Sequence, residues 1–304
     1  MVDRILRIEP MKKSSCILLT LILGFLTSAR AQTEYVKAIE KWRSDKEIEL
    51  KKETGWLTVA GLFWLKEGIN TVGAGPDFDV RLTSNFKQGK FGQIDFKNGA
   101  ATLKVESGVE AQSDGKSIST IDLVSDEKGE PTRIRTGSQT FYLIKRDDRF
   151  GIRLKDTESK ARLTFKGQHW FPIDESYKVT ARFEAWPEPK EVMIPNILGG
   201  HFKMKTPGTL KFALKGKEHS LQPVTEDDGT LFIIFRDGSN KKETYTAGRF
   251  LYATPAVNGE VVLDFNKAEN PPCAFTPFAT CPLPPPQNTL DVQIKAGEKR
   301  SDHH

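Results

Sequence analysis

The polar residues best suited to binding or chemistry lie near the C-terminus of this 304-residue chain, beside a run of prolines. Carboxylate, amide and guanidinium groups can hold a polar ligand, and carboxylates also act as general acids or bases. Seven prolines between residues 271 and 286 fix the backbone, so this segment is predicted to be a stiff loop without a helix or sheet of its own. Because binding sites favour loops held by a scaffold, we predict a ligand site here. Its candidate residues are Arg249, Tyr252, Asp264, Asn266, Glu269, Asn270 and Asn288.

A structural role for the same polar residues stays open. Asn and Asp side chains often bond the backbone donors and acceptors that prolines and turns leave without partners. Arg249 could form an ion pair with Asp264, or it could grip an anionic ligand through two parallel hydrogen bonds.

Two cysteines, Cys273 and Cys281, lie eight residues apart within the proline-rich loop. A disulfide between them would close a short ring and stabilise the fold by roughly 2–3 kcal/mol in the chain-entropy model. Two free thiols are an alternative. A metal site shared with His169 or His201 is another, although the C-x₂₋₄-C spacing of zinc sites is absent. We predict the disulfide and expect neither a bound metal nor a cofactor.

Two segments resemble the signatures of a bacterial and archaeal family called domain of unknown function 1684. The C-terminal resemblance covers residues 248–252, 263–276 (LDFNKAENPPCAFT), 281–284 and 288. Residues 55–70 (GWLTVAGLFWLKEGIN) resemble the N-terminal signature, so the two together bracket most of the chain. The resemblance implies no biochemical activity. Some family members look cytosolic, which weakens the disulfide prediction and slightly favours a site made from the two thiols.

The N-terminus has the pattern of a secretory signal peptide over residues 1–31. Lys12 and Lys13 precede an apolar run over residues 17–26, which is too short to span a bilayer, and an A-x-A-like site follows. We predict cleavage before Gln32 and a periplasmic or secreted protein. The remaining chain has 40 basic and 38 acidic residues, a net charge of +2, which gives no electrostatic support for nucleic-acid binding.

The rest of the chain is predicted to be mainly β, a sandwich or open barrel of antiparallel sheets with one N-terminal helix. Residues 32–54 contain the helix, with apolar side chains at helical spacing to about residue 51. Two β-rich halves follow, residues 55–168 and 169–304, and the second contains the signature loop over residues 248–297. Strand-like runs occupy residues 56–59, 62–65, 91–96, 101–105, 117–124, 132–136, 140–145, 151–154, 162–165, 177–185, 191–194, 209–214, 218–224, 231–235 and 261–265. The prolines after Trp186 are predicted to end one of these strands.

The first β-rich half has a weak resemblance to a forkhead-associated domain, a β-sandwich that binds phosphothreonine. Residues 67–82 (EGINTVGAGPDFDVRL) carry it. The arginine that usually follows the glycine is absent, because Ala74 follows Gly73, which puts phosphopeptide binding in doubt.

Three functions agree with these patterns. The first is an exported protein that binds a small molecule or carbohydrate-like ligand near the loop from Asp264 to Asn288, helped by aromatic residues such as Phe275 and Phe278. The second is a hydrolase-type enzyme using the same loop, with Asp264, Glu269, Cys273 or His169. The third is a structural or interaction module of the cell envelope. The sequence contains no nucleotide-binding or metalloprotease fingerprint.

Overall fold

The computed structural model describes the backbone of residues 14–300 and the side chains of residues 32–300. The chain divides into two compact units at Ser44 and Asp45. Helix α1 (Ser14–Lys51) contains the predicted helix and ends at the predicted residue. Residues 1–13 of the predicted signal peptide, and the side chains up to residue 31, lie outside the described part. None of the described helices is long and apolar enough to cross a membrane.

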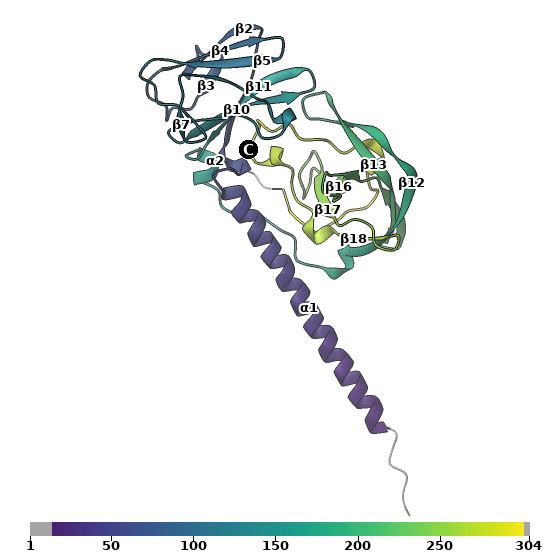
Figure 1. Ribbon diagram of the computed structural model, residues 1–304. Coiled ribbons are helices and arrows are strands. Elements are labelled where there is room, and N and C mark those ends of the chain that lie inside the picture. Colours follow the sequence, from purple (N-terminus) through teal and green to yellow (C-terminus); the bar gives the residue numbers. More distant parts are fainter. Residues whose placement is uncertain (1–13, 301–304) are drawn as a thin grey trace, which may run out of the picture. The chain divides into compact units, whose positions relative to one another are not determined.

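Two sheets enclose the first core of the second unit (Figure 1). A six-stranded sheet has the order β1-β11-β10-β9-β6-β7, and a five-stranded sheet has the order β3-β2-β4-β5-β8. The strands are β1 (Val59–Trp64), β2 (Gly68–Ala74), β3 (Val80–Leu82), β4 (Lys90–Lys97), β5 (Ala100–Val105), β6 (Gln112–Ser113), β7 (Lys116–Ser117), β8 (Thr120–Asp122), β9 (Arg133–Thr136), β10 (Gln139–Arg146) and β11 (Arg149–Asp156). Alternating residues of these strands point inward, and Phe91, Ile94 and Phe141 are fully buried among them.

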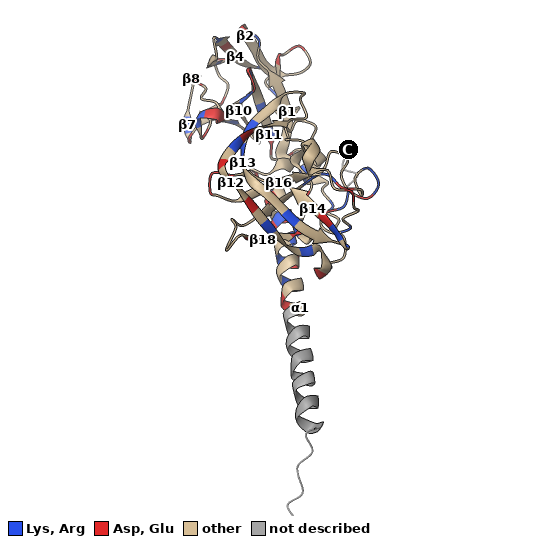
Figure 2. Ribbon diagram, turned by 90° about the vertical axis from the view of Figure 1, so that its right-hand side faces the viewer, with Lys and Arg blue, Asp and Glu red and all other residues tan. Residues whose placement is uncertain are grey.

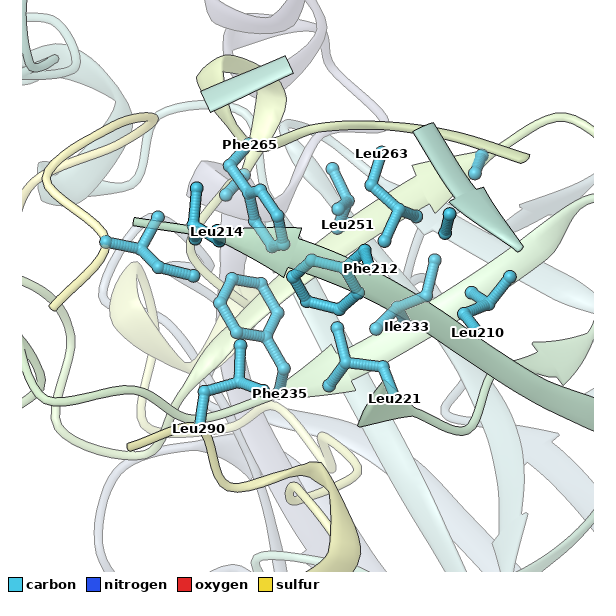
Figure 3. Packing of buried hydrophobic residues seen from close by; sticks show 14 of the residues in the cluster. Leu210, Phe212, Leu214, Leu221, Ile233, Phe235, Leu251, Leu263, Phe265 and Leu290 are labelled. Carbon is cyan, nitrogen blue, oxygen red and sulfur yellow. The ribbon is translucent and has the colours of Figure 1, made fainter. Parts of the chain in front are cut away.

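A second core forms between the sheets of the C-terminal half. One sheet has the order β14-β13-β12-β18 and the other β15-β16-β17. The strands are β12 (Lys178–Pro195), β13 (His201–Leu214), β14 (Lys217–Leu221), β15 (Val224–Thr225), β16 (Leu231–Phe235), β17 (Arg249–Ala253) and β18 (Glu260–Asp264). Phe212, Phe235 and Phe265 pack in its centre, with leucines around them (Figure 3).

The predicted fold class is confirmed: the protein is mainly β, its sheets are mostly antiparallel, and it has an N-terminal helix. The turn at Asn98 and Gly99 joins β4 and β5 as the sequence predicted. Strands β12 and β13 both contain several basic residues, and β12 also contains acidic ones (Figure 2). The proline-rich loop contains two 3₁₀ turns, η5 (Pro272–Ala274) and η6 (Pro286–Asn288), and no strand.

Three local predictions were wrong. Residues 56–58 form a 3₁₀ turn, η1 (Trp56–Thr58). The predicted strand over residues 162–165 begins instead within a short helix, α2 (Lys160–Leu163), because the Ser159 side chain accepts a hydrogen bond from the Arg162 backbone and caps the helix. Strand β12 also continues beyond Trp186. Its pairing with β13 shifts between Ala185 and Lys190, so the two prolines lie in a bulge where no ladder hydrogen bond is required.

Candidate functional site

A cavity of about 460 Å³ lies within the second unit, beside the first residues of the proline-rich loop. Segments distant in the sequence form its wall: the end of α1, the residues that follow it, strand β17 and the loop itself. The lining side chains are Lys46, Glu49, Leu50, Lys52, Thr54, Trp56, Gln168, Phe250, Tyr252, Glu269, Asn270, Pro272 and Phe275, together with Gly55. Aromatic groups with a few polar ones are typical of small-molecule sites.

Backbone pairing holds Glu269 next to strand β17. Phe250 and Glu269 form an isolated antiparallel bridge with two N–H···O bonds of 2.9 Å. The ladder cannot continue beyond Asn270, because Pro271 and Pro272 have no N–H groups. The prolines therefore end the pairing at the residues that line the cavity.

Glu269 forms an ion pair with Lys46 in the wall of the cavity. Its carboxylate lies 3.0 Å from the ammonium nitrogen of Lys46, and the two side chains are 15% and 30% exposed. Burial raises the pKa of Glu269, and the neighbouring Glu49 also raises it, while Lys46 opposes the rise. A carboxylate this well buried is costly without a charged partner. A ligand that binds Glu269 must therefore bind beside Lys46 or take its place.

Tyr252 forms the most exposed part of the aromatic wall, at 42% exposure. Phe232 stacks on one face of its ring, with centroids 4.8 Å apart and planes 9° apart, so only the other face is open to a ligand. The Lys46 ammonium lies 5.7 Å from the same ring's centroid. Trp56 stands elsewhere on the wall, with the Arg153 guanidinium 5.3 Å from its ring.

Glu298 lies fully buried behind Asn270. Its backbone N–H donates to the Ala268 carbonyl (2.8 Å), and its Oε2 accepts from the Asn270 backbone N–H (2.8 Å). Gly297 precedes it with φ +77°, and a Cβ there would lie 2.4 Å from the Ala268 carbonyl, so a larger residue would strain this approach.

Three side-chain oxygens around Glu298 are buried without a hydrogen-bond donor: its own Oε1, Oε1 of Gln168 and Oδ1 of Asn270. Burial raises the pKa of Glu298 to about 7, and the neighbouring Glu269 carboxylate adds to the rise, while the Asn270 backbone N–H that donates to Oε2 opposes it. A proton on the Glu298 carboxyl would give this donor-poor group a donor. Glu298 therefore supports the two cavity-lining amides Asn270 and Gln168.

The structure divides the seven predicted ligand residues into two sets. Tyr252, Glu269 and Asn270 line the cavity. Arg249 lies in the interior at 0% exposure, and its carboxylate partner is Asp237, 2.7 Å from Nη2. The same nitrogen donates to the Ile294 carbonyl at 2.9 Å, so Arg249 fastens the C-terminal segment to β17.

The other three predicted residues bond the backbone. Asp264 accepts from the backbone N–H and the side-chain Nδ2 of Asn266, each at 3.1 Å, and so caps the turn η4 (Phe265–Lys267). Asn266 exchanges two bonds with the backbone of Asp174. Asn288 accepts from the Gln222 N–H and donates to the carbonyls of Gln222 and Ile234.

Several cavity residues were not among the sequence candidates, notably Lys46 and Gln168, and Glu298 behind the wall was also missed. A signal for Glu298 exists, because Leu290, Val292, Ile294 and Ala296 alternate toward the core and position 298 continues that alternation. Lys46 and Gln168 have no such local signal, because they are far from the loop in the sequence and only the tertiary fold brings them to it.

Cys273 and Cys281 are free, buried thiols, so the predicted disulfide is not supported. The Cys273 backbone N–H donates to Sγ of Cys281 at 3.2 Å. Hydrogen bonding from the Cys281 thiol lowers the pKa of Cys273 despite burial, and the same contact raises the pKa of Cys281. The Tyr245 hydroxyl donates to the Cys273 carbonyl at 2.9 Å. Within the described residues, no group of three or more His, Cys, Asp and Glu side chains is placed to hold a metal ion.

Comparison with known proteins identifies a family over the C-terminal half of the chain. The family model for a protein of unknown function, DUF1684, matches residues 163–299, which include the loop, Glu269, Asn270 and Glu298. A solution NMR structure of an uncharacterised protein from Haloarcula marismortui is 30% identical, with 47% of this chain and 81% of that chain covered and a TM-score of 0.40. No curated protein matches. The chain belongs to the DUF1684 family of proteins of unknown function.

Proposed function

We propose that this protein binds a small polar ligand, such as a carbohydrate-like molecule, in the cavity beside Glu269. One observation carries the proposal: the cavity combines an aromatic wall with polar groups from three separate segments. Sugars and other polyols bind to such surfaces by placing an apolar ring face on an aromatic side chain and their hydroxyl groups on carboxylates and amides. Tyr252 offers one open ring face, and Glu269 and Asn270 stand beside it.

Ligand-observed saturation-transfer NMR with a panel of sugars, polyols and small polar fragments tests this proposal. We expect the wild type to bind members of the panel and Tyr252→Ala to lose that binding. Trp186→Ala is the matched control, because Trp186 is an aromatic residue on β12 that does not line the cavity. The proposal is overturned if nothing in the panel binds, or if Tyr252→Ala binds as well as the wild type does.

A hydrolase-type enzyme is the second candidate. The observation that favours it is a cavity-lining carboxyl group, Glu269, whose pKa burial raises, since general acids need a raised pKa to hold a proton near neutral pH. Release of product from ester, glycoside or phosphate substrates, abolished in Glu269→Gln, would establish turnover. The absence of release above the blank would leave the binding function alone.

We also propose that the protein is exported to the periplasm or secreted. The support is the charged and apolar pattern of residues 1–31, with its A-x-A-like site. Intact mass measurement of the protein from a periplasmic or medium fraction should give a chain that begins at Gln32. A full-length chain confined to the cytoplasm would refute the proposal.

A further inference from the structure

The surroundings of Tyr252 are predominantly acidic. Tyr252 lines the cavity described above, and it also lines a second, open hollow together with Glu226, Asp227, Asp228 and Thr230. Five carboxylates line the two hollows, against two ammonium groups. The acids are Glu49, Glu226, Asp227, Asp228 and Glu269, and the bases are Lys46 and Lys52.

These carboxylates shift the pKa values of neighbouring ionisable groups. Glu269 and Glu226 both raise the pKa of the Tyr252 hydroxyl, in addition to the effect of burial. Burial raises the pKa of Glu226, and Asp227 and Asp228 raise it further. Burial disfavours a charge of either sign, whereas the contribution of the neighbouring carboxylates disfavours a negative charge and favours a positive one.

The protein already holds an ammonium group at this position. Lys46 lies 3.0 Å from the Glu269 carboxylate and 5.7 Å from the Tyr252 ring centroid, a combination of ion pair and cation–π contact. Its side chain is 30% exposed and is long and flexible, so a ligand can displace it without disturbing the core. Lys46 thus shows which chemical group the pair Tyr252 and Glu269 receives.

We propose that the ligand of this site is a small organic cation, an amine or a quaternary ammonium compound, whose charged nitrogen replaces the Lys46 ammonium between Tyr252 and Glu269. This inference rests on the proposed binding function and names the chemical class of the ligand. The open ring face of Tyr252 contacts the alkyl groups around the nitrogen, and Glu269 supplies the counter-charge. Glu226 contributes from the second hollow.

Two pairs of probes separate charge from shape: choline with its neutral isostere 3,3-dimethylbutan-1-ol, and glucosamine with glucose. Isothermal titration calorimetry at pH 7 and low salt should show that the cation binds at least about tenfold more tightly than its neutral partner in one pair, as one partly buried charged contact predicts. Lys46→Met should increase the cation's affinity about tenfold, because the competing ammonium is gone. Glu226→Gln should weaken cation binding while it leaves the ion pair between Lys46 and Glu269 in place. Glu188→Gln is the control, because Glu188 is an exposed acid outside both hollows, and it should not change cation binding.

The proposal is overturned if neither cation binds more tightly than its neutral partner, or if Lys46→Met weakens cation binding while the variant stays folded by circular dichroism. Equal binding of cation and neutral partner, lost in Tyr252→Ala, would overturn this inference and leave the proposed function standing. Failure of these four probes and of the whole polar panel would overturn both.

Discussion

Replacing Glu298 by glutamine should remove a pH dependence from the stability of the fold. The Glu298 carboxyl is fully buried, and its Oε1 has no donor. Burial raises its pKa from 4.5 to about 7 in the folded protein. Between these pH values the folded protein holds a proton that the unfolded chain has released, so the free energy of unfolding falls as pH rises. Below pH 4.5 both states are protonated, and above pH 7 both are ionised, so the dependence vanishes.

The two pKa values correspond to a loss of about 3 kcal/mol of stability across this range. Glutamine has the same shape, offers an N–H donor to the two amide oxygens and does not ionise. The stability of Glu298→Gln relative to the wild type should therefore rise by about 3 kcal/mol from pH 4.5 to pH 8.

Urea unfolding followed by tryptophan fluorescence, at half-unit steps of pH, measures this difference. Acids remote from Glu298 titrate alike in both proteins and cancel in the comparison, whereas the coupling to Glu269, which raises the pKa of Glu298, is part of the measured difference. Glu188→Gln, which removes an exposed acid, serves as the control. A wild-type minus Glu298→Gln difference that stays constant across the range would refute the idea that Glu298 holds a proton for Asn270 and Gln168.

Two further predictions concern residues in the interior. Arg249→Met should destabilise the fold by about 3–5 kcal/mol in urea unfolding, because it leaves the Asp237 carboxylate buried without its partner; Asp237→Asn with Arg249→Met should lose less than the two single changes together. Cys273 and Cys281 should resist alkylation in the native protein and react in urea without reductant, as intact mass can show; a reaction that requires reductant would establish the disulfide instead.

Local sequence patterns predicted most of the strands, but they predicted little of how distant segments pack together. Alternation and an Asn-Gly turn suffice for β4 and β5, because both signals lie within a few residues. The cavity depends on contacts between residues far apart in the sequence, such as Lys46 with Glu269. No sequence pattern around Lys46 predicts that ion pair. The prolines after Trp186 were wrongly predicted to end the strand. They lie in a bulge, where the backbone N–H groups that prolines lack are not needed for pairing.

The signature loop shows why polar residues beside prolines are ambiguous when read from sequence. Prolines and turns leave backbone groups without regular partners, and Asn266 and Asn288 serve those groups in the interior. Glu269 escapes that role because the bridge to Phe250 already satisfies its backbone, whereas the Asn270 side chain still donates to the Lys299 carbonyl at 2.9 Å. The Glu269 side chain is then available to the cavity. It follows that substitutions at Asn266 and Asn288 report on folding, whereas substitutions at Glu269 report on the ligand, although all lie within one short signature.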